Sequence, residues 1–163
     1  MSIKRDLMKD KLFDAKSYNT VYISIEDEQK VRHEQMEILV ELLCDPKNKS
    51  LQTQVYDLLK KERKAVELLI HALEEAKGDK KRLVAVCWEA NIDCNEYIDT
   101  FAGIVLKDDF SVAMEALTVI EHMTDIPATK VIEWVDKVKA AYSADNPKAP
   151  LYMDLIELLR RWE

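Results

Sequence analysis

The sequence predicts an all-α protein, and three observations lead to that prediction. The chain has 163 residues, of which 48% are apolar, enough to bury one continuous core in a single domain spanning residues 1–163. It contains only two glycines and four prolines, too few for the many tight turns of a β-sandwich or barrel. From residue 24 onward, apolar residues recur at helical spacing between short polar connections. The sequence therefore predicts about six or seven helices in which sequential neighbours pack antiparallel.

The N-terminal segment differs in pattern from the helices that follow it. Residues 1–23 combine a short helical pattern with an alternating, β-branched stretch, and we expect them to dock on the stacked helices of residues 24–163. Further along, five charged residues, Lys60 to Lys64, interrupt an apolar stripe, so this region is open to one long helix or two shorter ones. The helical patterns cover about residues 24–45, 51–77, 79–91, 95–107, 109–123, 127–144 and 148–162.

Acidic residues mark several of the predicted helix starts. Asp79 is placed to cap the helix that follows it, and either Asp108 or Asp109 is placed to cap another. Asp93 with Glu96 forms a further predicted cap pair. These signals predict that the connections between helices are short.

Two parts of the chain also resemble each other at a shift of 30 residues. Apolar, small and capping positions coincide under this shift, and a repeated helix pair is the simplest explanation. The coinciding positions include Leu68 with Ile98, Ala72 with Ala102 and Asp79 with Asp109.

The repeated stretches resemble consecutive units of HEAT-like helical repeats. These stretches read AVELLIHALEEAKGDKKRLVAVCWEANID and YIDTFAGIVLKDDFSVAMEALTVIEHM, and the shared marks are the cap residues Asp79 and Asp109 with the small and apolar residues after them. The resemblance covers roughly residues 51–142. It implies a short right-handed α-solenoid of antiparallel helix pairs with a scaffold or protein-binding role, in which the second helix of each pair lines a concave face.

The sequence indicates no catalytic or cofactor chemistry. The three cysteines lie in or beside apolar helical stretches, which predicts reduced, buried thiols in a cytoplasmic protein. Glu67, His71 and Glu75 stand four residues apart and could face a cation, but this pattern is far more often a surface histidine between carboxylates. We therefore expect no metal, no cofactor and no enzymatic activity. No segment is apolar enough to predict export or membrane spanning.

Charge is distributed unevenly along the chain. The net charge is −7 overall, whereas residues 45–88 carry ten basic and seven acidic side chains and residues 89–125 carry one basic and nine acidic. The resulting −8 of the second segment would repel nucleic acid. Such an acidic face is either solvated or a docking surface for a basic partner.

A polar stripe on one predicted helix gives the candidate binding residues. Glu115, Thr118 and His122 recur along residues 111–123, whose other positions are mostly apolar, so the helix is expected to be buried except along this stripe. The 30-residue shift places Trp88 beside Thr118. Whether Trp88 is an exposed anchor or a core residue stays open at this point.

Together, these observations predict a noncatalytic scaffold that binds a protein or peptide along the concave face of a HEAT-like solenoid. A basic partner is one option. An alternative is a HEAT-like nucleic-acid repair enzyme, which the acidic charge opposes. Another is a structural homo-oligomer that pairs through the apolar terminal helix, residues 151–162, and the oligomeric state is left open.

Overall fold

The computed structural model describes residues 25–163 and confirms that the fold is helical, since no strand occurs in this range. Three short 3-10 helices lie between or after the α-helices: η2 (Pro46–Leu51), η3 (Asn95–Tyr97) and η4 (Arg160–Trp162). The predicted docking of residues 1–23 falls outside the described residues. The α-helices are α2 (Ile25–Cys44), α3 (Gln52–Lys61), α4 (Arg63–Glu74), α5 (Lys80–Glu89), α6 (Ile98–Lys107), α7 (Phe110–Glu121), α8 (Ala128–Ala141) and α9 (Ala149–Leu159).

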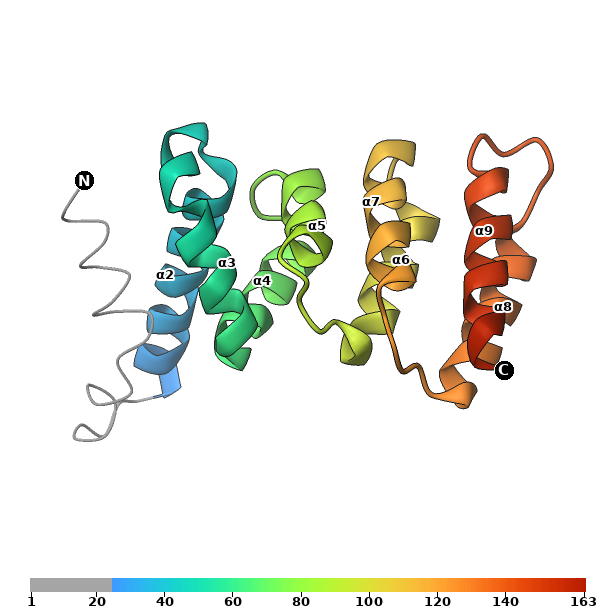
Figure 1. The fold of residues 1–163 in the computed structure, drawn as a ribbon, viewed down its shortest axis with the longest axis horizontal. Coiled ribbons are helices and arrows are strands. Elements are labelled where there is room, and N and C mark those ends of the chain that lie inside the picture. Colours follow the sequence, from blue (N-terminus) through green and yellow to red (C-terminus); the bar gives the residue numbers. More distant parts are fainter. Residues whose placement is uncertain (1–24) are drawn as a thin grey trace.

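The helices form a row that is two layers deep (Figure 1). Helices α5, α7 and α9 lie in one layer, where α7 contacts both of the others, and α6 and α8 lie behind them. Successive helices α6 and α7 pack closely together, as do α8 and α9. At the other end of the row, α2 packs on α4 and α5. Helices α6 and α7, and helices α8 and α9, thus form antiparallel pairs, as their short connections predict.

The region left open by the sequence folds as two helices. Helix α3 ends at Lys61, and the backbone of Glu62 is extended before α4 begins at Arg63. The break falls within the charged stretch that interrupts the apolar stripe. Each of the two shorter helices can then turn its own apolar side, which includes Leu59 in α3 and Leu69 in α4, into the core.

The predicted aspartate caps are confirmed at two helices. The Asp79 carboxylate accepts a hydrogen bond from the Arg82 amide at 3.1 Å and caps α5. Of the two candidates at α7, Asp109 is the cap, and it accepts from the amides of Ser111 and Val112. Since Asp109 takes this role, its neighbour Asp108 is free to pair with a lysine at the start of α5.

The predicted pair of Asp93 and Glu96 is only half right. Asp93 does accept a hydrogen bond from the Asn95 amide, at 3.1 Å. Glu96, however, extends to Arg63 of α4, with 2.8 Å between the charged groups. A cation from the neighbouring helix pair therefore takes the carboxylate that the sequence pattern assigns to a local cap.

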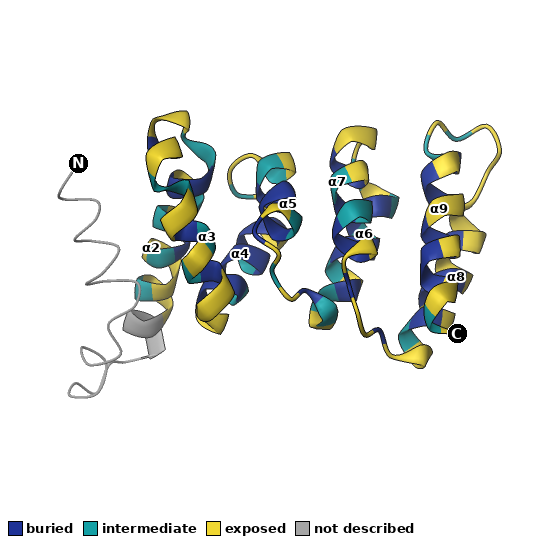
Figure 2. Ribbon diagram, in the orientation of Figure 1, coloured by how far each residue is buried: buried dark blue, intermediate teal, exposed yellow. Residues whose placement is uncertain are grey.

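The core fills the space between the two layers and runs the length of the row (Figure 2). Among its fully buried side chains are Phe101 of α6 and Leu155 of α9. Cys87 and Cys94 are buried as predicted, but Cys44 is only partly buried, at the end of α2. The apolar side of α9, the terminal helix, is buried within the protein. No helix of the described part of the chain is long and apolar enough to cross a membrane.

Candidate protein-binding face

The seam between α5 and α7 brings Trp88 and Glu115 together. The indole N–H of Trp88 donates to a carboxylate oxygen of Glu115 at 2.9 Å. Trp88 is neither an isolated exposed anchor nor a core residue, because its ring packs against the core while it remains partly exposed. The repeat register therefore predicts correctly which helix Trp88 meets. Glu115 of the predicted stripe is therefore not a free surface side chain, because it accepts the hydrogen bond of Trp88.

His122 and Thr118 complete the predicted stripe. The imidazole of His122 stacks on the indole of Trp88, with the ring centroids 6.3 Å apart and the planes 26° from parallel. Its Nδ1 lies 2.8 Å from the carbonyl oxygen of Thr118, and the Thr118 hydroxyl donates to the Met114 carbonyl. Three of the four predicted residues thus form one contact group, and Thr118 supports it through the backbone of α7.

Two exposed apolar residues of α7 belong to the same face and are not predicted by the sequence. Phe110 is 48% exposed and Met114 is 44% exposed. The sequence pattern over residues 111–123 assigns Met114 to the buried side of the helix, because apolar side chains dominate there, and it makes no prediction for Phe110. In the structure Phe110, Met114, Thr118 and His122 stand at successive steps of four residues, which places them along one ridge of α7. Their spacing is the signal that could have identified them.

A polar network joins α3 to α5. The guanidinium of Arg82 donates to the Glu89 carboxylate at 2.7 Å and to the Tyr56 hydroxyl at 2.7 Å. The Tyr56 hydroxyl in turn donates to Glu89. Burial acts to raise the pKa of Glu89, but these two hydrogen bonds outweigh it and lower the pKa. Burial and the bond to Glu89 raise the pKa of Tyr56, so this hydroxyl remains a donor.

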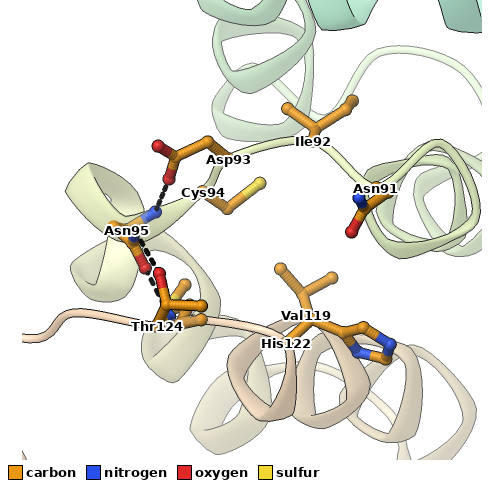
Figure 3. Close-up of a pocket in the computed structure, with 9 residues that line it drawn as sticks. Asn91, Ile92, Asp93, Cys94, Asn95, Val119, His122 and Thr124 are labelled. Atoms are coloured by element: carbon orange, nitrogen blue, oxygen red, sulfur yellow. Dashed lines mark hydrogen bonds between the residues drawn. The ribbon is translucent and has the colours of Figure 1, made fainter.

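A shallow hollow opens where the segment that follows α5 meets the C-terminal end of α7 (Figure 3). Its volume is about 220 Å³. The amide of Asn95 ties its rim together, because the carbonyl oxygen accepts from the Thr124 and Asp125 amides and the amino group donates to the Thr124 hydroxyl. His122 belongs both to the hollow and to the ridge, so the two features are continuous. The hollow is lined by Asn91, Ile92, Asp93, Cys94, Asn95, Val119, His122, Met123 and Thr124.

The charge of residues 89–125 is only partly neutralised within the described chain. Four of its carboxylates form ion pairs with lysine or arginine: Glu89, Glu96, Asp99 and Asp108. The others form no ion pair with any described residue: Asp93, Asp109, Glu115, Glu121 and Asp125. Glu115 and Glu121 stand on opposite sides of the ridge by their helical positions.

The histidine and cysteine candidates do not assemble into a chemical site. His71 lies 2.9 Å from Glu75, whereas Glu67 pairs with Arg63, so the three residues do not converge on a cation. Contact with the Cys94 thiol, together with burial, raises the pKa of Cys87 well above its ordinary value. Throughout residues 25–163, no group of three or more histidine, cysteine and acidic side chains is placed to hold a metal ion.

Comparison of the chain with protein-family models, with curated proteins and with solved structures gave no match. The resemblance to HEAT-like repeats therefore stays a prediction from the sequence.

Proposed function

We propose that this protein is a noncatalytic cytoplasmic scaffold, a short right-handed α-solenoid of HEAT-like helix pairs that binds another protein. Its binding face is the exposed side of α5 and α7, centred on Trp88. The observation that carries the proposal is that Trp88 is bonded to Glu115 of α7, the helix that also exposes the apolar side chains of Phe110 and Met114.

This arrangement has the features of a binding hot spot. Tryptophan and methionine are enriched at protein interfaces, and aromatic anchors there contribute most of the binding energy. The bond to Glu115 and the stack on His122 fix the indole before a partner arrives. Less side-chain freedom is then lost on binding, which favours affinity.

The row of helix pairs supports the HEAT-like interpretation. Helix α7 is the second member of the pair α6–α7, α5 follows α4 in the chain, and α5 and α7 lie side by side in one layer. In HEAT-like solenoids the second helices supply the binding surface. The stripe predicted from the sequence lies in this layer.

The proposal is tested by placing a photoreactive amino acid at position 114 of the full chain. A matched control carries the same group at Ile132, which is 60% exposed but lies on α8 in the opposite layer. We expect the probe at position 114 to crosslink a partner protein in cell extract, and the probe at position 132 not to do so. The captured protein is then purified, and its binding to the unmodified chain is measured directly.

Changing Trp88 to Ala should weaken that binding by about tenfold or more, as for an interface anchor. Thermal unfolding of the variant checks that its fold is intact. Equal capture from positions 114 and 132, or an unchanged affinity of the folded variant, would contradict the proposal. Crosslinks to a second copy of the chain would instead favour the homo-oligomer, and crosslinks to DNA the repair enzyme.

A further inference from the structure

We infer that the partner presents a basic segment in which lysine or arginine side chains surround a large apolar residue. This inference rests on the proposed function, because it describes what the face of α5 and α7 would bind. It is drawn from the shape of the ridge and hollow and from the charges on either side of them.

The shape of the face fits a short segment of chain. The ridge from Phe110 to His122 rises about 18 Å, since an α-helix advances about 1.5 Å per residue. An extended peptide of about five or six residues covers this length. At one end the exposed Phe110 and Met114 offer apolar contact, and at the other the ridge enters the hollow beside Val119 and Met123. An apolar side chain of the partner would be buried at either place.

The charges beside the ridge select a cationic partner. Glu115 and Glu121 flank it on opposite sides, and Asp93 and Asp125 lie at the hollow or next to its rim. None of these four carboxylates forms an ion pair within the described part of the chain. An acidic segment placed on the ridge would meet uncompensated negative charge on both sides, whereas a basic one would satisfy it.

The cations at the start of α5 act on other carboxylates, since Lys80 pairs with Asp108 and Lys81 acts on Asp109. Arg82 of α5 is held by the Glu89 carboxylate and the Tyr56 hydroxyl, and its side chain is largely covered. Within residues 89–125 the only lysine or arginine is Lys107, at the end of α6. A partner that carries its own cations therefore complements the face better than one that carries carboxylates.

The test uses three synthetic peptides of equal length and the indole N–H signals of the folded chain. One peptide contains lysine and leucine, the second glutamate and leucine, and the third lysine and serine. Trp88 reports the proposed face, and Trp134 of α8 serves as an internal control in the opposite layer. A Trp88→Phe variant assigns the Trp88 signal. We expect the lysine–leucine peptide to shift the Trp88 signal but not the Trp134 signal, and the other two peptides to shift neither.

Charge-reversing variants then locate the binding. Glu121→Lys should weaken binding of the lysine–leucine peptide by about tenfold. Asp136→Lys changes the net charge equally, at an exposed position on α8, and should leave the affinity within about twofold. Lysine is tolerated at position 121 because it lies in the last turn of α7, where a cation is favourable.

Five results would overturn the inference. A glutamate–leucine peptide that shifts Trp88 as strongly would refute the basic partner but leave a protein-binding face in place. A lysine–serine peptide with equal effect would refute the apolar anchor. Equal shifts at Trp134, equal losses in the two charge variants, or no shift with any peptide would show that the face does not select basic segments. The crosslinking at position 114 then decides separately whether it binds protein at all.

Discussion

At the scale of single residues, Glu115 is the position where the structure changes the expected energetics. The sequence places it on a solvent-facing stripe, where substitution costs no more than about 0.5 kcal/mol. In the structure it accepts the hydrogen bond of a partly buried indole. The Glu115 carboxylate therefore contributes to the stability of the fold as well as to the charge of the surface.

We therefore expect Glu115→Ala to lower the free energy of unfolding by about 1 kcal/mol, the net value of one such hydrogen bond. Ile120→Ala, on the buried side of the same helix, should cost about 2–5 kcal/mol. Leu117 lies among the apolar positions of the same helix but is only partly buried, so Ile120 is the better comparison. Denaturant unfolding of both variants makes the measurement. Equal losses would mean that Glu115 is as deeply buried as the core.

The polar network of Tyr56, Arg82 and Glu89 predicts a dependence of stability on pH. Its hydrogen bonds hold the pKa of Glu89 below its ordinary value of 4.5, despite the opposing effect of burial. Because the folded pKa is the lower one, the contribution is fully present above pH 4.5 and is lost as the pH falls through the folded pKa. Glu89→Gln should show a flatter loss of stability below pH 4.5 than the unchanged chain. Thermal unfolding across acidic pH tests this, and parallel curves would rule it out.

At the scale of helices and their connections, the two glycines have opposite roles. Gly78 has a positive φ of 66°, and a Cβ there would lie 2.4 Å from the Cγ1 of Val40, where the turn before α5 approaches α2. Gly103 lies within α6, and a Cβ there would meet only the Cη2 of Trp134, at 4.0 Å. The first position requires glycine, and the second accepts a side chain.

Replacement of each glycine by alanine should thus change stability in opposite directions. Gly78→Ala should destabilise the protein by more than about 1 kcal/mol, because the backbone strain adds to the clash. Gly103→Ala should stabilise it by about 0.5–1 kcal/mol, through better helix propensity. The midpoint of denaturant unfolding of each variant, compared with that of the unchanged chain, gives the sign of each change in stability. A gain at Gly78 would show that the turn relaxes away from α2.

The helices themselves were largely predictable, and their exposed sides were not. Asp79 and Asp109 identify helix starts because a cap acts within a few residues of chain. The contact of Trp88 with α7 follows from the 30-residue repeat. The exposure of Phe110 and Met114 depends on what packs over α7, and the sequence indicates it only through their four-residue spacing from Thr118 and His122. The bonds of Tyr56 to Arg82 and Glu89 join residues far apart in sequence and outside the repeated positions, so nothing in the sequence points to them.

At the scale of the whole molecule, the helix pairs contact mainly their neighbours in the row. Helix α9 packs on α6, α7 and α8, while α2 packs on α3, α4 and α5. A loss of packing at one end of the row should then destabilise the helices at that end and leave those at the other end almost unchanged.

We expect Leu155→Ala, which opens a cavity beneath α9, to raise the hydrogen exchange of amides in α8 and α9 far more than that of amides in α2 and α4. Leu39→Ala in α2 is the matched variant at the opposite end, and its effect should be the mirror image. Hydrogen exchange measured by mass spectrometry resolves the helices. Equal acceleration throughout by either variant would mean that the row unfolds as one unit.

The layout of the row has a consequence for the chain under tension. Because α2 and α9 lie at opposite ends (Figure 1), a pull between them passes through each junction between helix pairs in series. The force is the same at every junction, whereas the extensions add. The junction between α4–α5 and α6–α7 is crossed by polar contacts in both layers, from Trp88 to Glu115 and from Arg63 to Glu96. Under tension each group of packed helices should keep its length while the junctions between the groups extend. The junction with the fewest contacts should separate first, and its strength sets the force at which the protein begins to unfold.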